Sequence, residues 1–383
     1  MSNLPLQGVT VLEFSQYLSG PSAGLRLADL GARVIKIERP GSGDACRQLA
    51  IKNLWAADGS SLLFHTINRN KESFAANLKN PTDLELIKLL IEKADVVTHN
   101  FRPGVMEKVG LGYEDSKVIN PAIIYAEISG YGTEGPWKDL PGQDLLLQAI
   151  SGLTYTTGNE DDLPVPFGIA IADIICGSHL TQGVLAALIR RQKRGVGARI
   201  EVNLLASLLD FQFELFTTYF ASKKLPQRTK TNNGHTLLSA PYGVYQTADG
   251  YIALAMVELE KLSEGLNCRE LLMYKQEDAF ALRNEIKELL ALHLKEQTSL
   301  YWLELLHSYG IWAMPVMSWK EMKAHPAYQS LLMEQKILAG GNEITTTRCP
   351  IRFNHQRLFS TNAAPGLGEH NQTILQEFKN VRV

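Results

Sequence analysis

The first forty residues predict two strands joined by a helix, an arrangement that few folds accommodate. Residues 8–14 read as a strand, Gly20 and Pro21 open a helical run over 22–30, and residues 33–38 read as a second strand. Strand, helix and strand within about 30 residues form a βαβ unit, whose two strands are parallel. Because parallel sheets need helices on both faces, the unit predicts a doubly wound α/β fold.

Similar units follow, so the sheet is expected to extend beyond the first two strands. The pattern predicts helices over 81–94, 113–119 and 173–191, and strands over 95–98, 123–128 and 198–203.

The composition changes near residue 222, where 223–228 form a polar, basic linker. Asp249 and Gly250 then predict the turn of a hairpin over 243–254, and helical segments fill much of 258–309. We therefore expect a first domain over 1–224, a smaller domain over 225–320, and a C-terminal segment, 321–383, that returns to the first domain.

Charge and cysteine content exclude several classes of protein. The chain has 383 residues and a net charge of −2, with 38 basic and 40 acidic side chains, which gives no overall field for nucleic acid or an anionic membrane. The four cysteines are scattered, so neither a disulfide framework nor a zinc knuckle is expected. No stretch approaches about 18 uninterrupted apolar residues, and we expect a cytoplasmic protein.

Several nucleotide and nucleophile motifs are absent or misplaced. Gly41 and Gly43 follow the second strand rather than the first, and no G-x-G-x-x-G or phosphate-binding P-loop is present. Cys176, Ser178 and His179 are too close on one helix to face each other as a catalytic triad. The nine histidines show no metal-binding spacing, so no metal site is expected.

A lone carboxylate, Asp173, lies where the apolar segment 168–172 runs into a long apolar helix. Burying an ionised carboxylate is costly unless the group is paired or used in chemistry. The simpler interpretation is that Asp173 caps the helix by accepting hydrogen bonds from its first N–H groups.

Three basic segments follow predicted strands. Ligands bind at the carboxyl ends of the strands in doubly wound sheets, where cations and free N–H groups suit phosphates. Each segment could instead cap a helix or pair with a surface carboxylate, but together they indicate an anionic ligand. They are Arg39, residues 68–71 with Lys79, and residues 100–104 with Lys108.

Seven ordered motifs give the chain a resemblance to the class III CoA-transferases. This family of formyl-CoA and carnitine CoA-transferases also includes the α-methylacyl-CoA racemases, and the resemblance covers essentially the whole chain. The motifs are residues 11–14 with 20–21, 34–41, 68–71, 94–96 with 100–104, 128–132 with 135–136, the Asp173 segment, and 364–370.

The resemblance implies a Rossmann-like large domain from both chain ends, a smaller α+β domain, and an interlocked homodimer. It implies that CoA is a substrate, with no tightly bound cofactor, and that the catalytic Asp is Asp173. The family's CoA-contacting positions fall on Arg39, Ala76, Asn77, Leu78, Lys79, Asn100, Phe101, Arg102 and Lys108, and on Gln143 and Asp144 within 141–144.

The activity that the resemblance implies is transfer of CoA from an acyl-CoA to a carboxylic acid, through an anhydride and then a CoA thioester on Asp173. Racemase members carry a His where this chain has Gln143, and an amide cannot act as a base near neutral pH. Transfer is therefore favoured over racemisation. A CoA-binding protein without turnover is disfavoured because Asp173 is present.

Two features of the acceptor side stay open in the sequence. Residues 255–261 look like a strand end running into a helix, rather than the Gly-rich loop that closes over the site in some formyl-type members. His235 and Tyr242 are candidates for shaping the acid pocket, but neither the donor nor the acceptor acid follows from the sequence.

Overall fold

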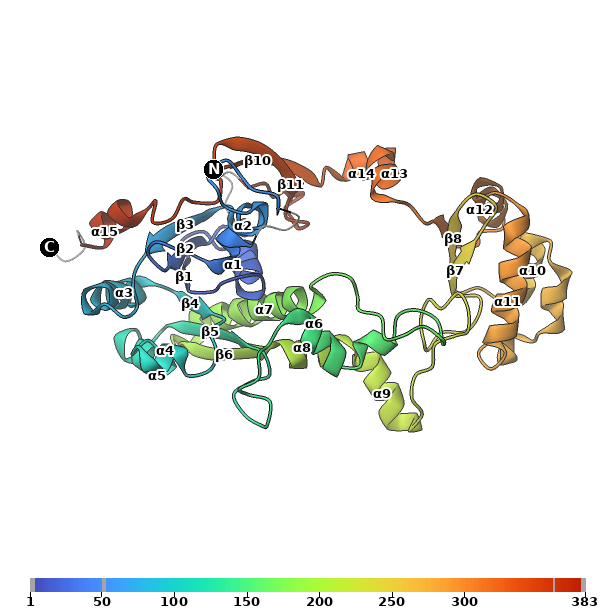
Figure 1. Cartoon of the computed structure of the whole chain (residues 1–383), viewed down its shortest axis with the longest axis horizontal. Helices are drawn as coiled ribbons and strands as arrows, with labels where there is room; N and C mark the ends of the chain where they lie inside the picture. Colours follow the sequence, from blue (N-terminus) through green and yellow to red (C-terminus); the bar gives the residue numbers. More distant parts are fainter. Residues whose placement is uncertain (1–3, 50–52, 361, 380–383) are drawn as a thin grey trace. The chain divides into compact units, whose positions relative to one another are not determined.

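The computed structural model describes residues 4–49, 53–360 and 362–379 and forms two compact units (Figure 1). The first, called the sheet unit below, comprises Met1–Leu147, Ala170–Phe211 and Leu331–Val383. The second comprises Gln148–Ile169 and Gln212–Ser330. Residues 148–169 and 212–224, which the sequence placed in the first domain, thus group with the second unit. The expected domain boundaries at 224/225 and 320/321 stay predictions.

Six parallel strands form the sheet of the first unit, in the order β3-β2-β1-β4-β5-β6. The predicted doubly wound parallel sheet is therefore confirmed. Its order reverses between β1 and β4, and in such sheets the ligand crevice lies at the carboxyl ends of the strands on either side of this point. The strands are β1 (Thr10–Glu13), β2 (Arg33–Glu38), β3 (Lys71–Ala75), β4 (Val96–His99), β5 (Ile124–Ser129) and β6 (Ala198–Asn203).

Helices cover both faces of this sheet. Apolar side chains of the strands pack against α3, whose Pro81 stands at its first position behind the capping Asn80, and against Ile374 of α15. On the other face α7 packs against α1, β5 and β6. The helices are α1 (Ser19–Asp29), α2 (Leu62–Asn68), α3 (Pro81–Lys93), α4 (Val105–Lys108), α5 (Tyr113–Ile119), α6 (Asp144–Ile150), α7 (Ile171–Arg194), α8 (Leu204–Phe211) and α15 (Asn371–Lys379).

The C-terminal segment adds two small antiparallel pairs and then follows the edge strand β3. The side chain of Asn371 accepts from Ala75 N at 2.8 Å and donates to Ala75 O at 3.0 Å, which ties α15 to β3. The added strands are β10 (Glu334–Ala339), β11 (Asn342–Thr347), β12 (Arg352–Phe353) and β13 (Gln356–Arg357).

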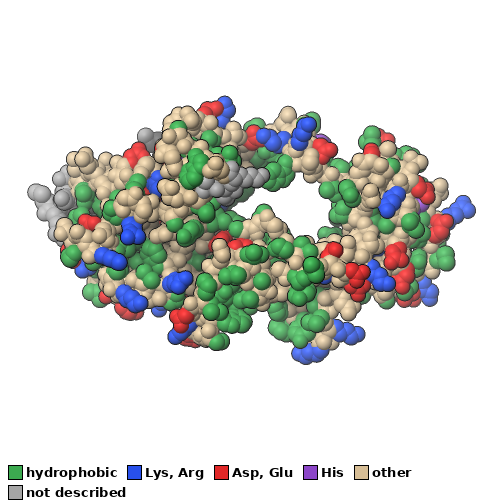
Figure 2. All heavy atoms as spheres, in the orientation of Figure 1, with side chains coloured by type: hydrophobic (Ala, Val, Ile, Leu, Met, Phe, Trp, Pro, Cys, Tyr) green, Lys and Arg blue, Asp and Glu red, His purple; other side chains and the backbone are tan. Residues whose placement is uncertain are grey.

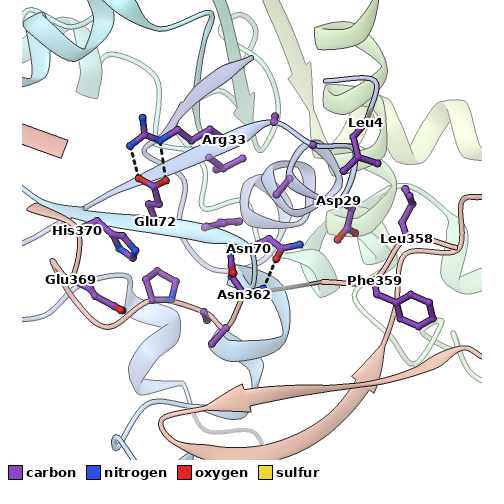
Figure 3. Close-up of a pocket in the computed structure, with 18 of the residues that line it drawn as sticks. Leu4, Asp29, Arg33, Asn70, Glu72, Leu358, Phe359, Asn362, Glu369 and His370 are labelled. Carbon is purple, nitrogen blue, oxygen red and sulfur yellow. Dashed lines mark hydrogen bonds and ion pairs between the residues drawn. The ribbon is translucent and has the colours of Figure 1, made fainter. Parts of the chain in front are cut away.

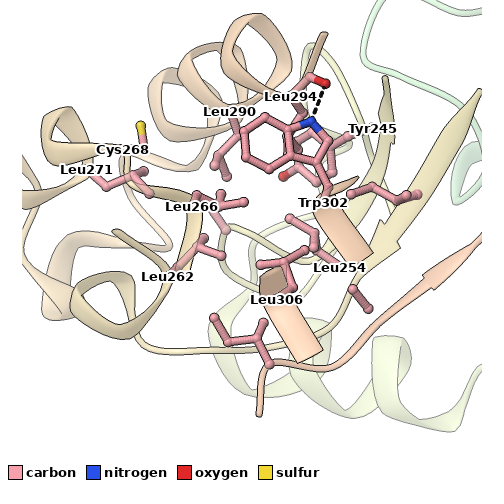
Figure 4. Close-up of a cluster of buried hydrophobic side chains, with 14 of the residues drawn as sticks. Tyr245, Leu254, Leu262, Leu266, Cys268, Leu271, Leu290, Leu294, Trp302 and Leu306 are labelled. Atoms are coloured by element: carbon pink, nitrogen blue, oxygen red, sulfur yellow. Dashed lines mark hydrogen bonds between the residues drawn. The ribbon is translucent and has the colours of Figure 1, made fainter. Parts of the chain in front are cut away.

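The second unit has a three-stranded antiparallel sheet and its own core (Figure 4). β7 (Gly243–Gln246) and β8 (Tyr251–Leu254) form the predicted hairpin, and β9 (Ala313–Pro315) pairs with β8. In the core, Trp302 donates its indole N–H to Leu294 O at 2.8 Å. The helices are α9 (Phe213–Ser222), α10 (Leu259–Leu266), α11 (Arg283–His293), α12 (Ser299–Ser308), α13 (Trp319–Ala324) and α14 (Pro326–Leu331).

The segment after β8 and the four cysteines were both subjects of expectations from the sequence. β8 ends at Leu254 and α10 begins at Leu259, as predicted for a strand end that runs into a helix. The four cysteines are free and buried. Short 3₁₀ turns lie at Ala45–Gln48, Leu153–Tyr155, Arg269–Met273, Gln276–Asp278 and Leu294–Glu296.

Among the described residues one helix, α7, is long and apolar enough to cross a membrane, with a mean hydropathy of 1.4 over its most apolar window. Helices in the cores of soluble proteins meet the same criteria. Because α7 packs against α1 and two strands of the sheet, its apolar residues have a structural use within the unit.

Candidate active site

Asp173 is the third residue of α7, and its backbone is capped by a second carboxylate. The residue before the helix, Ala170, offers no side-chain cap, and the N–H of Asp173 donates to Asp144 Oδ2 at 3.1 Å. Asp144 is itself the first residue of α6. The simpler interpretation of Asp173, as a helix cap, is therefore wrong: Asp144 has that role, and the Asp173 carboxylate is left for other contacts.

The Asp173 carboxylate accepts a hydrogen bond from Ser19, the first residue of α1. Ser19 is buried, and its hydroxyl lies 3.4 Å from Asn100 Nδ2. Asn100 also donates to Gln16 O at 2.7 Å and accepts from Gln16 N at 2.8 Å. Because Gln16 follows β1 and Asn100 follows β4, this hydrogen-bonded set lies at the point where the strand order reverses.

Two glycines allow the start of α1 to pack closely against its neighbours, Gly177 against α7 and Gly20 against the loop after β1. A Cβ at Gly177 would lie 2.6 Å from Ser19 O and 2.3 Å from Ser22 Oγ, and neither distance is tolerable. A Cβ at Gly20 would lie 2.2 Å from Ser15 Oγ. Gly177 therefore permits the close approach of α7 to α1, and Gly20 permits the close approach of α1 to Ser15.

The surroundings of Asp173 disfavour its charge. Burial, and then the negative charge of Asp144, raise the pKa of Asp173 to about 6, although the hydrogen bond from Ser19 acts in the opposite direction. No described Lys, Arg or His forms an ion pair with Asp173. A carboxylate that is half-buried, ionised at neutral pH and unneutralised by a cation is suited to act as a nucleophile.

Four predicted CoA-contacting cations lie along the carboxyl edge of the sheet. They are exposed, and none makes a side-chain hydrogen bond or ion pair with a residue that the structure describes. Such unpaired cations are available for phosphate groups. They are Arg39 after β2, Lys79 after β3, Arg102 after β4, and Lys108 at the end of α4.

The basic segment 68–71 makes no such contribution, which corrects the expectation from the sequence. Lys71 Nζ lies 2.9 Å from both oxygens of Glu13, and its side chain is fully buried. Arg69 is also buried and lies 3.6 Å from Asp29. Both cations neutralise carboxylates inside the unit, so neither can meet an exposed phosphate.

The other predicted contact residues differ in exposure. Ala76 is buried in the core, Leu78 packs against it, and Asn77 is exposed with its side chain accepting from Lys79 N at 3.0 Å. Phe101 is half-buried and stacks on His99, and Gln143 is exposed. All twelve predicted site residues belong to the sheet unit.

Ser19 and Gln16 contact the site but were missed from the sequence. Their position carried a usable signal, because Gln16 lies in the loop after the first strand and Ser19 begins the first helix, and ligands bind at this turn of a doubly wound sheet. No motif distinguished them from ordinary turn residues.

As expected, Cys176, Ser178 and His179 do not form a triad. Ser178 donates to Ile174 O at 2.9 Å, and His179 instead lies 3.0 Å from Ser207 Oγ and 3.5 Å from Asp210. Ser207 is buried and makes a helix-to-helix contact, so this serine is inaccessible as a nucleophile.

A cavity of about 880 Å³ lies at the opposite, amino edge of β2 and β3 (Figure 3). Two of the charged residues that line it, Arg33 and Glu72, pair through two hydrogen bonds. At the carboxyl edge a smaller cavity of about 270 Å³ is lined by Phe101, Glu127 and Asn203, among others. Only the smaller one adjoins the predicted contact residues.

A family model described as CoA-transferase family III matches residues 6–371. The chain belongs to this family. It is 33% identical to the succinyl-CoA:glutarate CoA-transferase of Mus musculus, over 97% of this chain and 86% of that protein. It is equally similar to the succinate–glutarate CoA-transferase of Agrobacterium fabrum, over 98% and 96% of the two chains.

Solved structures agree with the family assignment. A CAIB/BAIF family protein from Brucella suis superposes with a TM-score of 0.85 at 32% identity, covering 98% of this chain and 100% of the other. The expectation from the sequence, an enzyme of the class III CoA-transferases, is thereby confirmed.

The raised pKa of Asp173 predicts that Asp173→Asn stabilises the fold at high pH. Above about pH 6 the wild-type carboxylate is charged in a site that disfavours the charge, whereas asparagine is neutral and of the same shape. We expect a gain in unfolding free energy on the order of 1–2 kcal/mol at pH 8 after allowing for solvent screening. The gain shrinks as the pH falls below about 6, and it is absent only well below the ordinary carboxyl pKa of 3.8, where the group is protonated in both the folded and the unfolded states.

Urea unfolding of both proteins across this pH range measures the difference. Asp139→Asn is the matched control, since Asp139 is exposed and makes no hydrogen bond or ion pair with a described residue. Equal stability of wild type and Asp173→Asn at pH 8 would contradict the electrostatic description of the site.

Proposed function

We propose that the protein transfers CoA from an acyl-CoA thioester to a carboxylic acid, and that succinyl-CoA and a dicarboxylate such as glutarate are its substrates. Family membership supports CoA transfer in general. The narrower substrate choice is supported by the names of relatives in Mus musculus, Agrobacterium fabrum and Chloroflexus aurantiacus, which specify succinate or succinyl-CoA.

The observation that carries the proposal is the Asp173 carboxylate, held by Ser19 without a neutralising cation beside it. In the first step one carboxylate oxygen of Asp173 attacks the thioester carbonyl carbon. The carbon–sulfur bond breaks, CoA leaves as a thiolate, and a mixed anhydride joins Asp173 to the donor acid. The thiolate then attacks the Asp173 carbonyl of the anhydride and releases the donor acid as a carboxylate.

The second half repeats these steps in reverse with the acceptor acid. Its carboxylate attacks the aspartyl-CoA thioester, which releases the thiolate and forms a second anhydride. The thiolate attacks the acceptor's carbonyl carbon, giving the product acyl-CoA and restoring the Asp173 carboxylate. No proton and no oxidant is needed, and retention of each acyl group on the enzyme limits its loss to water.

The same proposal assigns the phosphates of CoA to the exposed cations Arg39, Lys79, Arg102 and Lys108. Coenzyme A carries a 3′-phosphate and a pyrophosphate, and three parallel strands bring these side chains to one edge of the sheet. Ala76, Asn77, Leu78, Asn100, Phe101 and Gln143 remain proposed contacts with the rest of the CoA molecule.

The proposed intermediates can be trapped. Incubation with succinyl-CoA followed by hydroxylamine should convert Asp173 to its hydroxamate, which mass spectrometry of the Asp173 peptide detects. Asp173→Asn should remove both the adduct and the transfer while CoA still binds. Transfer that continues without modification of Asp173 would contradict the mechanism. Exchange of an α-proton with deuterated solvent, in the absence of an acceptor acid, would instead indicate the racemase alternative.

Removal of single cations should weaken CoA binding selectively. We expect Arg102→Ala and Lys79→Ala to raise KM for succinyl-CoA about tenfold, with kcat little changed and a smaller effect at high salt. Lys93→Ala is the control, because Lys93 ends α3 and precedes the amino end of β4. Measurements with dephospho-CoA identify the partner of the 3′-phosphate, and an unchanged KM in both variants would contradict the assignment.

We further propose that the active enzyme is an interlocked homodimer in the cytoplasm. Large apolar side chains are exposed in the single chain, including Trp319 at 86% and Leu163 at 82%. Figure 2 shows hydrophobic side chains spread over the face it draws. Extensive exposed apolar surface is typical of obligate interfaces. Sedimentation velocity should give twice the mass of the chain at all practical concentrations, whereas a stable monomer would contradict the proposal.

A further inference from the structure

Asp144, which the sequence predicts to contact CoA, also contacts the backbone of Asp173. Its carboxylate accepts the Asp173 N–H at 3.1 Å, at a helix start that has no other side-chain cap. The Asp144 carboxylate of α6 therefore lies at the first turn of α7, which also carries Asp173. The hydrogen bond stabilises the start of the helix, whereas the negative charge of Asp144 disfavours ionisation of Asp173.

We propose that Asp144 is a positioning residue that holds the first turn of α7 and, through its charge, favours covalent loading of Asp173. The inference rests on the proposed function, since it concerns the aspartyl anhydride and thioester. In the free enzyme two negative charges lie close together. Esterification of Asp173 by an acyl group or by CoA sulfur removes one of them, so the repulsion is relieved only in the covalent states.

The groups that face Asp173 support this description. The Ser19 hydroxyl of α1 donates to it, and the Asp144 carboxylate of α6 acts on it through its negative charge; the buried thiol of Cys176 lies one turn further along α7. The raised pKa of Asp173 has burial as its first cause and Asp144 as its second. No cation is among the groups that shift the pKa of Asp173, and the charge of Asp144 acts against ionisation of Asp173.

Neutral substitutions can separate the cap from the charge. Asp144→Asn and Asp144→Ser retain an oxygen that can accept the Asp173 N–H but lose the charge, whereas Asp144→Ala loses both. Asp139→Asn removes one negative charge from the neighbouring segment and is the control. Two variants with neutral caps keep the test valid if one of them folds poorly.

Two measurements apply to each variant. The first is the equilibrium constant for forming the aspartyl-CoA thioester, obtained by intact-protein mass spectrometry at fixed ratios of succinyl-CoA to succinate. The second is the acidic limb of kcat/KM against pH. In Asp144→Asn we expect the equilibrium constant to fall about 3- to 10-fold and the acidic limb to move to lower pH, as for an interaction of half to one pKa unit.

The outcomes distinguish this inference from its alternatives. An unchanged thioester equilibrium and an unchanged acidic limb in Asp144→Asn and Asp144→Ser would overturn it. A rise in KM for succinyl-CoA alone would overturn it in favour of the CoA contact expected from the sequence. If the wild type transfers CoA without any thioester on Asp173, the proposed function itself fails, and the role of Asp144 fails with it.

Discussion

The site depends on the close approach of two helices at the reversal point of the sheet. Gly177 of α7 leaves no room for a side chain against Ser19 O, so the first turn of α1 lies directly beside α7. This contact places the Ser19 hydroxyl on the Asp173 carboxylate. Core packing thus determines where the carboxylate lies, and any larger residue at Gly177 would displace the group that the proposed chemistry needs.

Buried ion pairs hold the loop that leads into α1. Lys36 donates to Ser15 O at 2.7 Å and lies 2.8 Å from Asp44, and Asp44 accepts from Tyr17 N at 3.1 Å. Glu13 forms ion pairs with both Lys36 and Lys71, so these charges are paired within the sheet unit. Buried pairs of this kind contribute little net stability, but they fix geometry because breaking one leaves an uncompensated charge.

The fold was more predictable than the detail of the site. The alternation of strand and helix patterns predicted the parallel sheet, and Asp249 with Gly250 predicted the hairpin, because these signals are local. The exposed cations at the carboxyl edge and the buried Lys71 have similar sequence contexts. Only the folded structure shows that Lys71 neutralises Glu13. Asp144 and Ser19 likewise act through contacts between segments far apart in sequence, which no local pattern encodes.

The central claim is that a carboxyl oxygen of Asp173 takes part in every transfer. Each turnover by this route passes one oxygen from the acceptor acid to Asp173 and then to the next released donor acid. Turnover with glutarate labelled by a heavy oxygen isotope in its carboxylates, followed by mass spectrometry of the Asp173 peptide, measures this transfer directly. We predict at least one heavy oxygen in Asp173, and two after repeated turnover that uses both carboxylate oxygens. Label retained wholly in glutarate and glutaryl-CoA, with transfer proceeding, would contradict the account.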